Sequence, residues 1–361
     1  MIKLSLRNFK GVVEGSIELP DVAILVGGNN SGKTTLLEAI FLAPDPLRKT
    51  PYKGGIPAIV AVGRIHESLN AEGYEFLLNR YSADTAEVSL AINGVKSSLS
   101  IVKDERLIGY YTLSEEARYF FGWTERFSSN YTITPSPGSR EYEKFYIELY
   151  HLSKKVYHSF FKGQIVYKYP ELVEMLLYHP SLMELAWEGF LSRWGEIQPL
   201  TAKVAKQIAQ LIMEPIVNIT LEPFGGESKS VTLYALLEDG TRIRIGDLGD
   251  GAKNLITLML LYEYSKPKVL LVDDLESHMN PRAISVMLDW LSEEVEKGLR
   301  LVASTHSLDV AKRFLARLEG SKAVLLGLKD GKLSYKTLTL DELDNLESAG
   351  LDIRVAEPYL L

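Results

Sequence analysis

The sequence predicts an α/β fold whose core carries an antiparallel β lobe and an inserted helical lobe. The apolar run 23–26 leads into the glycine-rich segment 27–34, and apolar residues then recur at helical spacing. Two more strands are predicted at 269–272 and 300–303, which are followed by acidic or hydroxyl residues and then by a helical pattern. Buried strands that alternate with helices at both ends of a chain are typical of one α/β core assembled from two distant parts.

Three segments follow from this pattern. Residues 1–138 are expected to hold the N-terminal half of the core with the β lobe, 139–230 the helical lobe, and 231–361 the C-terminal half of the core. In the first segment, alternation on both sides of Asn93-Gly94 predicts a hairpin, because these two residue types tolerate the positive φ of the turn. Residues 128–139 are expected to form an exposed loop.

The expected helical lobe depends on apolar spacing. Apolar residues three and four positions apart predict a helix over 142–160 and another over 204–212. Between them, Ser181 with Glu184 three residues later is expected to form a capping box that opens a helix. No apolar stripe persists over three heptads, so no long coiled coil is expected.

Composition excludes several classes of protein. The 361 residues are 46% hydrophobic and carry a net charge of −7, values typical of a globular protein. Because cysteine is absent, disulfides and thiolate metal sites are excluded. The mild acidity argues against a protein that coats nucleic acid, although it leaves room for a local basic groove. The apolar runs are of strand length and the N-terminus lacks a signal-peptide pattern, so we expect a cytoplasmic protein without direct membrane insertion.

The segment 27–34, Gly-Gly-Asn-Asn-Ser-Gly-Lys-Thr, fits the phosphate-binding pattern G-x-x-x-x-G-K-[ST], with a predicted strand before it and a helix after it. Glycines let backbone N–H groups turn toward phosphates, and the N-terminus of the helix favours an anion. In this pattern the lysine reaches the terminal phosphates and the threonine hydroxyl holds Mg²⁺. The candidate nucleotide-binding residues here are Gly27, Asn29, Asn30, Ser31, Gly32, Lys33, Thr34 and Thr35.

Acidic and histidine side chains follow two other predicted strands. Asp273 is the candidate metal ligand beside Thr34, and Asp274 could orient or deprotonate an attacking water. His306 is expected at the same sheet edge, where open α/β sheets bind ligands. The alternative interpretation is an ordinary strand end with capping acids and a structural histidine. Four further histidines show no metal-ligand spacing and are given no role: His66, His151, His158 and His179.

A second anion-binding surface is predicted where Gly249, Asp250 and Gly251 open a helix. Two glycines beside a helix N-terminus leave backbone N–H groups accessible. Taken alone, the same residues are also the pattern of a flexible turn that precedes a helix.

These motifs together resemble the heads of ABC-type ATPases, a group within the phosphate-loop NTPase fold. The start 2–11 (Ile-Lys-Leu-Ser-Leu-Arg-Asn-Phe-Lys-Gly) and the segment 26–40 (Val-Gly-Gly-Asn-Asn-Ser-Gly-Lys-Thr-Thr-Leu-Leu-Glu-Ala-Ile) are similar to the SMC/RecF/OLD-like branch. The resemblance is specific over about 1–42 and 245–310, and it is vague in between. Only 55 residues follow His306 (361 − 306), so a stand-alone head without a TOPRIM-like nuclease domain is expected.

The resemblance implies ATP and Mg²⁺ as cofactors. It implies that Lys33 and Thr34 bind phosphate and metal, that Asp273 serves the metal, and that Asp274 stands where the family has its catalytic glutamate. His306 would sense the γ-phosphate, while 249–253 and 277–280 would meet a second subunit. The implied protein is an ATP-dependent homodimer that hydrolyses ATP slowly and acts in DNA repair or defence against foreign DNA, with a nucleic acid or an effector protein as a further partner.

Three departures from the family pattern keep alternatives open. Asp274 is one methylene shorter than glutamate, Gly249 stands where a serine often contacts the γ-phosphate, and no context supports Gln164 as the family's Q-loop glutamine. One alternative is therefore a nucleotide-gated sensor that controls a partner effector with little turnover. The other is the ATPase subunit of a membrane transporter.

Overall fold

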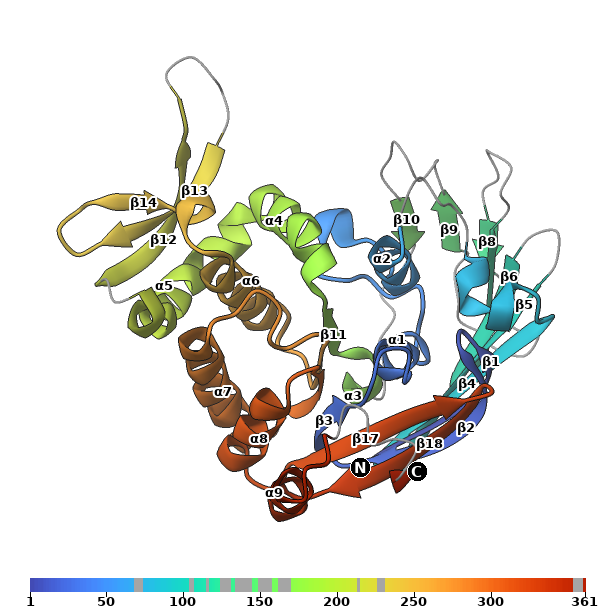
Figure 1. Cartoon of the computed structure of the whole chain (residues 1–361). Coiled ribbons are helices and arrows are strands. Elements are labelled where there is room, and N and C mark those ends of the chain that lie inside the picture. The colour runs from blue at the N-terminus through green and yellow to red at the C-terminus, as the bar shows by residue number, and fades with distance from the viewer. Residues whose placement is uncertain are drawn as a thin grey trace.

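The computed structural model describes residues 1–67, 74–103, 107–114, 117–123, 131–133, 145–148, 158–161, 170–212, 215–225, 231–352 and 360–361. These residues contain a twelve-stranded sheet in the order β11-β15-β16-β3-β17-β18-β2-β1-β4-β5-β6-β7. In Figure 1 the sheet curves round helix α1, from β11 near the centre to β4 and β5 at the right. The expected α/β class is confirmed.

The parallel half of the sheet joins the two ends of the chain. Its strands are β11 (Met175–Tyr178), β15 (Val269–Val272), β16 (Arg300–Ser304), β3 (Val22–Val26) and β17 (Lys322–Lys329). Each pairs with the next in parallel. All residues of β3, β11 and β15 are buried, as expected for continuous apolar strands covered on both faces.

The antiparallel half forms the β lobe. It consists of β18 (Lys332–Leu338), β2 (Val12–Leu19), β1 (Ile2–Phe9), β4 (Thr85–Ile92), β5 (Val95–Val102), β6 (Leu107–Ser114) and β7 (Ala117–Trp123). Neighbours in this half are antiparallel except β18 and β2, which make a parallel contact. The hairpin predicted at Asn93-Gly94 is confirmed, and both residues have positive φ. A second hairpin turns at Asp330-Gly331, which joins β17 to β18.

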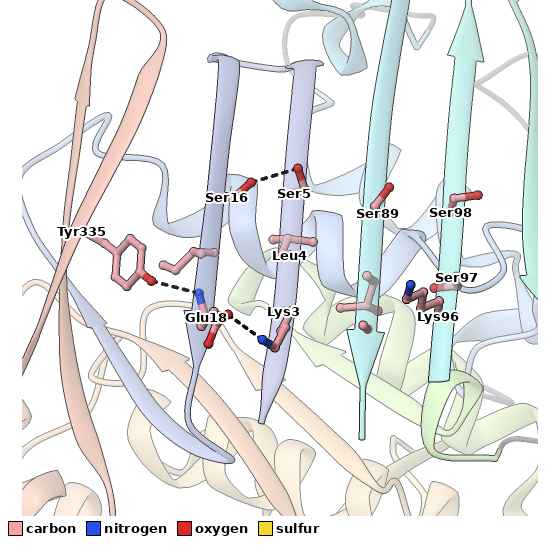
Figure 2. A pocket seen from close by; sticks show the side chains of 13 residues that line it. Lys3, Leu4, Ser5, Ser16, Glu18, Ser89, Lys96, Ser97, Ser98 and Tyr335 are labelled. Carbon is pink, nitrogen blue, oxygen red and sulfur yellow. Dashed lines mark hydrogen bonds and ion pairs between the residues drawn. The ribbon is translucent and has the colours of Figure 1, made fainter. Parts of the chain in front are cut away.

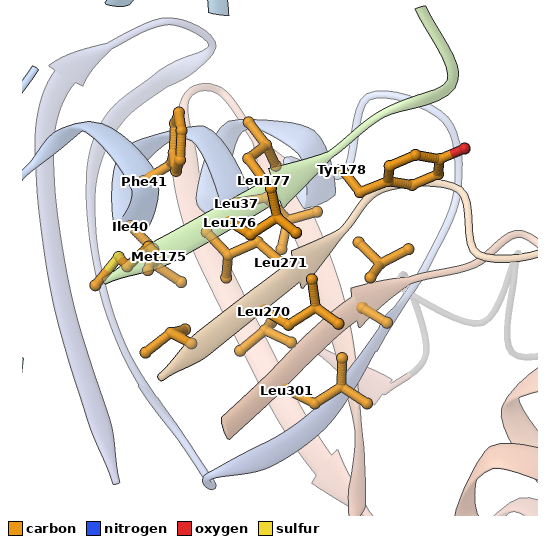
Figure 3. Close-up of a cluster of buried hydrophobic side chains, with 14 of the residues drawn as sticks. Leu37, Ile40, Phe41, Met175, Leu176, Leu177, Tyr178, Leu270, Leu271 and Leu301 are labelled. Atoms are coloured by element: carbon orange, nitrogen blue, oxygen red, sulfur yellow. The ribbon is translucent and has the colours of Figure 1, made fainter. Parts of the chain in front are cut away.

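Helices cover both parts of the core. They are α1 (Lys33–Leu42), α2 (Ala58–Ile65), α6 (Asp250–Ser265), α7 (Pro281–Glu296), α8 (Leu308–Arg317) and α9 (Leu340–Ser348). Figure 3 shows Leu37, Ile40 and Phe41 of α1 gathered with the apolar side chains of β11 and β15. This contact fixes the helix that follows the phosphate loop against the strands that carry the other candidate site residues.

The middle of the chain, over residues 131–244, contains strands as well as helices, and the expected helical lobe is the part 139–230 of it. It has helices α3 (Pro170–Val173), α4 (Met183–Ser192) and α5 (Trp194–Ile212), and two small sheets formed by β8 (Tyr131–Ile133), β9 (Phe145–Glu148) and β10 (His158–Phe161), and by β12 (Ile216–Pro223), β13 (Val231–Leu237) and β14 (Arg242–Arg244). Short 3-10 helices lie at Lys53–Gly55, Glu75–Leu77, Asn79–Tyr81, Pro180–Leu182 and Ile245–Asp247.

Two local predictions in this region are wrong for those of their residues that the structure describes. The helix expected over 142–160 is a strand at 145–148 and again at 158–161, and the loop expected over 128–139 is a strand at 131–133. Aromatic and β-branched residues such as those of 145–147 suit a pleated surface, and β9 pairs on both sides, which satisfies its backbone. The other positions of these two predictions lie outside the described residues. Within the segment 139–230, β11 joins the core sheet.

The outward face of the β lobe carries a shallow pocket of about 700 Å³ (Figure 2). Cross-strand register aligns Ser16, Ser5, Ser89 and Ser98 in one row. Lys3 pairs with Glu18 at 2.6 Å beside this row. The apolar residues of β1 point to the opposite, buried face, so the pocket and α1 lie on different sides of the sheet.

None of the helices in the described part of the chain combines the length and the apolar character needed to cross a membrane.

Candidate nucleotide site

The register of the parallel strands brings four chain segments to one sheet edge. Tyr178 pairs with Val272, and Val272 pairs with Ala303, so the residues that follow each strand emerge side by side. Ser304 pairs in turn with Leu25, just before the phosphate loop. Ligands of open α/β sheets bind at the carboxyl ends of strands, which is where the candidate residues lie.

The phosphate loop wraps back over its own lysine. Gly27 and Gly32 adopt φ of 140° and 96°, values that favour glycine. Lys33 is 6% exposed, and its Nζ donates to the carbonyl oxygens of Gly27 and Gly28 at 2.9 Å each. No side chain caps the N-terminus of α1, and a helix end of this kind favours an anion.

Thr34 and Asp273 meet although 239 positions separate them in the sequence. The hydroxyl of Thr34 donates to Oδ2 of Asp273 at 2.7 Å. The two residues expected to share a metal are therefore adjacent. No group of three or more His, Cys, Asp and Glu side chains within the described ranges could hold a metal alone. Mg²⁺, when bound, would be held by the hydroxyl of Thr34 and the carboxylate of Asp273, with phosphate oxygens and water completing its ligands, an arrangement that suits this ion.

Ser304 holds the two acids in place. Its hydroxyl donates to Oδ1 of Asp273 and accepts from the backbone N–H of Asp274 at 2.9 Å. Both oxygens of the Asp273 carboxylate therefore have a hydroxyl donor. None of the sequence motifs assigns a role to Ser304, although its place at the end of the strand 300–304 is a signal for one.

Asp274 and His306 form the exposed end of the site. Asp274 has φ of 56°, and its Oδ1 lies 3.6 Å from Nε2 of His306, with 45% and 46% of the two side chains exposed. Burial raises the pKa of the Asp274 carboxyl above its usual value, and the nearby Glu276 carboxylate raises it further. A carboxylate whose pKa is raised toward neutrality accepts a proton more readily.

Glu276 orients the loop that carries His306. Its carboxylate accepts from the backbone N–H of His306 at 2.7 Å and from the hydroxyl of Thr305 at 2.6 Å. This residue was also missed, because only the register of β15 and β16 brings it to the loop after β16.

His179 is a further histidine at this edge. Its Nε2 lies 3.9 Å from Oδ2 of Asp273, and its Nδ1 accepts from the backbone N–H of Ser181 at 3.1 Å. Burial lowers the pKa of the imidazole below its usual value, although the carboxylates of Asp273 and Glu38 act in the opposite direction. The capping box expected at Ser181 is wrong: His179 caps the turn, and α4 begins at Met183 without a side-chain cap.

The residues 249–251 lie beside a different loop. Gly249 caps α6, and Asp250 pairs with Lys253 at 2.6 Å. A Cβ on Gly251 would lie 3.1 Å from the carbonyl oxygen of His278, which explains why glycine suits this contact. The start of α6 therefore packs on the segment 277–279 of its own chain.

A buried ion cluster supports α1 one turn beyond Thr34. Glu38 is fully buried and pairs with Lys10, from the turn between β1 and β2, and with Nε2 of His66 at 2.5 Å. Burial acts to raise the pKa of the Glu38 carboxyl, but Lys10 and His66 outweigh it and hold the pKa below its usual value. Gln164, the remaining candidate from the sequence, lies outside the described residues.

Solved structures with similar shape include heads of SMC proteins. One is an SMC head bound to the C-terminal winged-helix domain of ScpA, with 14% identity, a TM-score of 0.48 and coverage of 95% of this chain and 98% of that one. Another is an SMC head with an extended coiled coil, bound to a ScpA domain derived from Pyrococcus furiosus. It has 13% identity and a TM-score of 0.47, and the match covers 97% of this chain and 99% of that one. The SMC head of Thermotoga maritima has 13% identity and a TM-score of 0.44, and the match covers 93% of this chain and 98% of that one.

Sequence comparison adds a relative and a family. A protein of Caldanaerobacter subterraneus subsp. tengcongensis named "Putative ABC transporter ATP-binding protein TTE0246" is 30% identical over 139 residues, 36% of this chain and 52% of that protein. The alignment thus spans about half the length of this relative. Residues 22–311 match the family described as "AAA domain, putative AbiEii toxin, Type IV TA system". Because this match runs from β3 through the phosphate loop and Asp273 to α8, the chain belongs to this family of phosphate-loop ATPase domains.

Proposed function

We propose that this protein binds ATP with Mg²⁺ at the sheet edge and hydrolyses it slowly. The hydrogen bond between Thr34 and Asp273 carries the proposal, because it joins the helix after the phosphate loop to the acid expected to serve the metal. Lys33 would exchange the carbonyl oxygens of its own loop for phosphate oxygens. Mg²⁺, when bound, would neutralise charge on the phosphates.

Asp274 and His306 are the proposed catalytic residues. Asp274 would accept a proton from the attacking water, and its raised pKa supports that role. His306 lies beside it and would meet the γ-phosphate. Because the aspartate is shorter than glutamate, the water would be held less well, and misplacement by about 1 Å can cost on the order of 10²-fold in rate.

Dimerisation would complete the site. The residues Gly249, Asp250 and Gly251 open α6, where Gly251 packs on His278 and Met279 of its own chain. We propose that they meet the nucleotide held by a second copy, so that ATP closes a homodimer. Gly249 has open space around its Cβ position, which leaves its backbone accessible to such a partner.

The test combines nucleotide binding, turnover and assembly. Wild type should bind ATP, hydrolyse it only with Mg²⁺, and elute as a dimer in size-exclusion chromatography when ATP is present. Lys33→Ala should abolish ATP binding and turnover, whereas Lys3→Ala, an exposed lysine on the outer face of β1, should leave both unchanged. ATP turnover that survives Lys33→Ala would contradict the proposal.

A second candidate function is a nucleotide-gated regulator with little turnover. The short, half-exposed Asp274 favours it, and so does the family description, which names a putative toxin of a type IV toxin–antitoxin system. In this case ATP binding would alter contact with a partner effector while phosphate release stayed near background. DNA repair or defence against foreign DNA, through a nucleic acid or an effector protein, is the setting we propose for either function.

A further inference from the structure

His179 makes two different contacts with its two ring nitrogens. Nδ1 accepts a hydrogen bond from the backbone N–H of Ser181 at 3.1 Å, so in the neutral ring this nitrogen carries no proton. The proton of the neutral ring is therefore on Nε2. That nitrogen faces Asp273 at 3.9 Å from Oδ2, too far for a direct hydrogen bond and suitable for one bridging water.

The same oxygen of Asp273 is the one that accepts from Thr34 at 2.7 Å. The other oxygen, Oδ1, is occupied by the hydroxyl of Ser304. When the hydroxyl of Thr34 turns from Asp273 to a metal ion, Oδ2 loses its donor, and Nε2 of His179 lies 3.9 Å from that oxygen. Partners of this kind orient the ligands of a metal and commonly affect affinity or activity by roughly 10–100-fold.

We propose that His179 is a positioning residue of the nucleotide site, which uses its Nε2–H, through one bridging water, to hold Oδ2 of Asp273 toward the magnesium of bound ATP. This inference rests on the proposed function and names a residue to which neither the motifs nor the family match assigns a role. The turn 180–182 serves the site as well, because its N–H at Ser181 fixes which nitrogen of His179 carries the proton.

A purely structural role for His179 would reside in Nδ1 alone, as the cap of the turn. Two substitutions separate the roles. His179→Asn keeps an acceptor near the position of Nδ1, since asparagine is a good capping residue, but cannot reach Asp273. His179→Gln carries an amide N–H about as far from the backbone as Nε2 and so restores the donor.

The experiment measures binding of a non-hydrolysable ATP analogue with and without Mg²⁺, together with the thermal unfolding of each unliganded variant. Wild type should bind the analogue more tightly with Mg²⁺. His179→Asn should unfold at the wild-type temperature and bind the metal-free analogue normally, yet need roughly 10–100-fold more Mg²⁺ for half-maximal enhancement. His179→Gln should recover to within about threefold of wild type, because the donor is restored.

The outcomes separate the two proposals. If wild type gains affinity with Mg²⁺ and His179→Asn responds to Mg²⁺ like wild type, the role of His179 is overturned while the proposed function stands. If His179→Asn and His179→Gln lose the response equally, the donor is not what matters, and the inference is again overturned. If wild type binds no analogue, or binds it equally with and without Mg²⁺, the proposed function fails first, and the inference fails with it.

Discussion

The hydroxyl of Tyr178 donates to Oδ1 of Asn254 at 2.8 Å, and Nδ2 of Asn254 donates to the carbonyl oxygen of Ser277 at 3.3 Å. This buried chain joins the strand that precedes His179 to the helix that Gly249 opens and to the loop after Asp274. A displacement of the nucleotide edge would therefore reach the surface proposed to meet a second subunit. Several consequences of the site's construction can be measured.

Tyr178→Phe removes the hydroxyl and leaves Oδ1 of Asn254 buried without this donor. We expect a loss of about 1–3 kcal/mol in the free energy of unfolding, the usual cost of an unsatisfied buried polar atom. Amide hydrogen exchange of 277–279 should also become faster, since Asn254 is no longer held. The control is Tyr335→Phe, because the hydroxyl of Tyr335 accepts a hydrogen bond from the backbone N–H of the exposed Glu18. Its free energy of unfolding should stay within about 0.5 kcal/mol of wild type. Equal amide hydrogen exchange of 277–279 in both variants would show that the hydrogen bond from Tyr178 to Asn254 does not stabilise this loop.

Asp274→Asn tests the proposed base without changing its shape. Asparagine tolerates the left-handed backbone of this position as aspartate does, so folding should be unaffected. Because the amide cannot accept the proton, turnover should fall about 10²–10⁴-fold, while the affinity for ATP stays within about threefold. Phosphate release and equilibrium binding measure the two effects. The trapped ATP should also make the dimer persist in size-exclusion chromatography, and unchanged turnover would remove Asp274 from the mechanism.

Ser304→Ala should weaken the metal end of the site. The loss of its hydroxyl frees Oδ1 of Asp273 and leaves the N–H of Asp274 without its acceptor. We expect turnover to fall roughly 10–100-fold, as for other groups that orient a metal ligand. Ser321 is a matched control, because it is also buried and its hydroxyl donates only to the carbonyl oxygen of Leu318. Ser321→Ala should leave turnover unchanged, and an equal loss in both variants would point to a general loss of stability.

Glu38→Gln should destabilise the fold and change its dependence on pH. Lys10 would be left beside a buried neutral amide, and breaking a buried ion pair costs about 3–5 kcal/mol. The pKa of Glu38 is lower in the folded protein than in the unfolded chain, so its stabilisation is complete above its unfolded pKa of about 4.5. That stabilisation is lost as the pH falls through the lower, folded pKa.

Chemical unfolding at pH 7 and pH 3 measures both effects. Wild type should lose more stability between these two values than Glu38→Gln, because only wild type carries the titrating carboxylate. Glu18→Gln breaks the exposed pair with Lys3, and it should cost no more than about 1 kcal/mol at pH 7. A parallel pH dependence of wild type and Glu38→Gln would contradict the contribution assigned to Glu38.

Local patterns were sufficient to predict much of this molecule. The phosphate loop, the buried strands at 23–26 and 269–272, and the turn at Asn93-Gly94 follow from rules that act over a few residues. Asn280 caps α7 with Pro281 at its first turn, a combination that is typical of helix starts. The same local rules failed over 145–148, because three-and-four spacing of aromatic residues does not distinguish a helix from a strand that gains partners on both sides.

The sequence by itself determined the residue types and the strand ends from which a phosphate and metal site could be built: Lys33, Thr34, Asp273, Asp274 and His306. Only the tertiary structure decided that Ser304, Glu276 and His179 join them. The physical reason is the register of parallel strands, which depends on packing between segments distant in the chain, such as β3 and β16, and so leaves no signal in any short window of sequence.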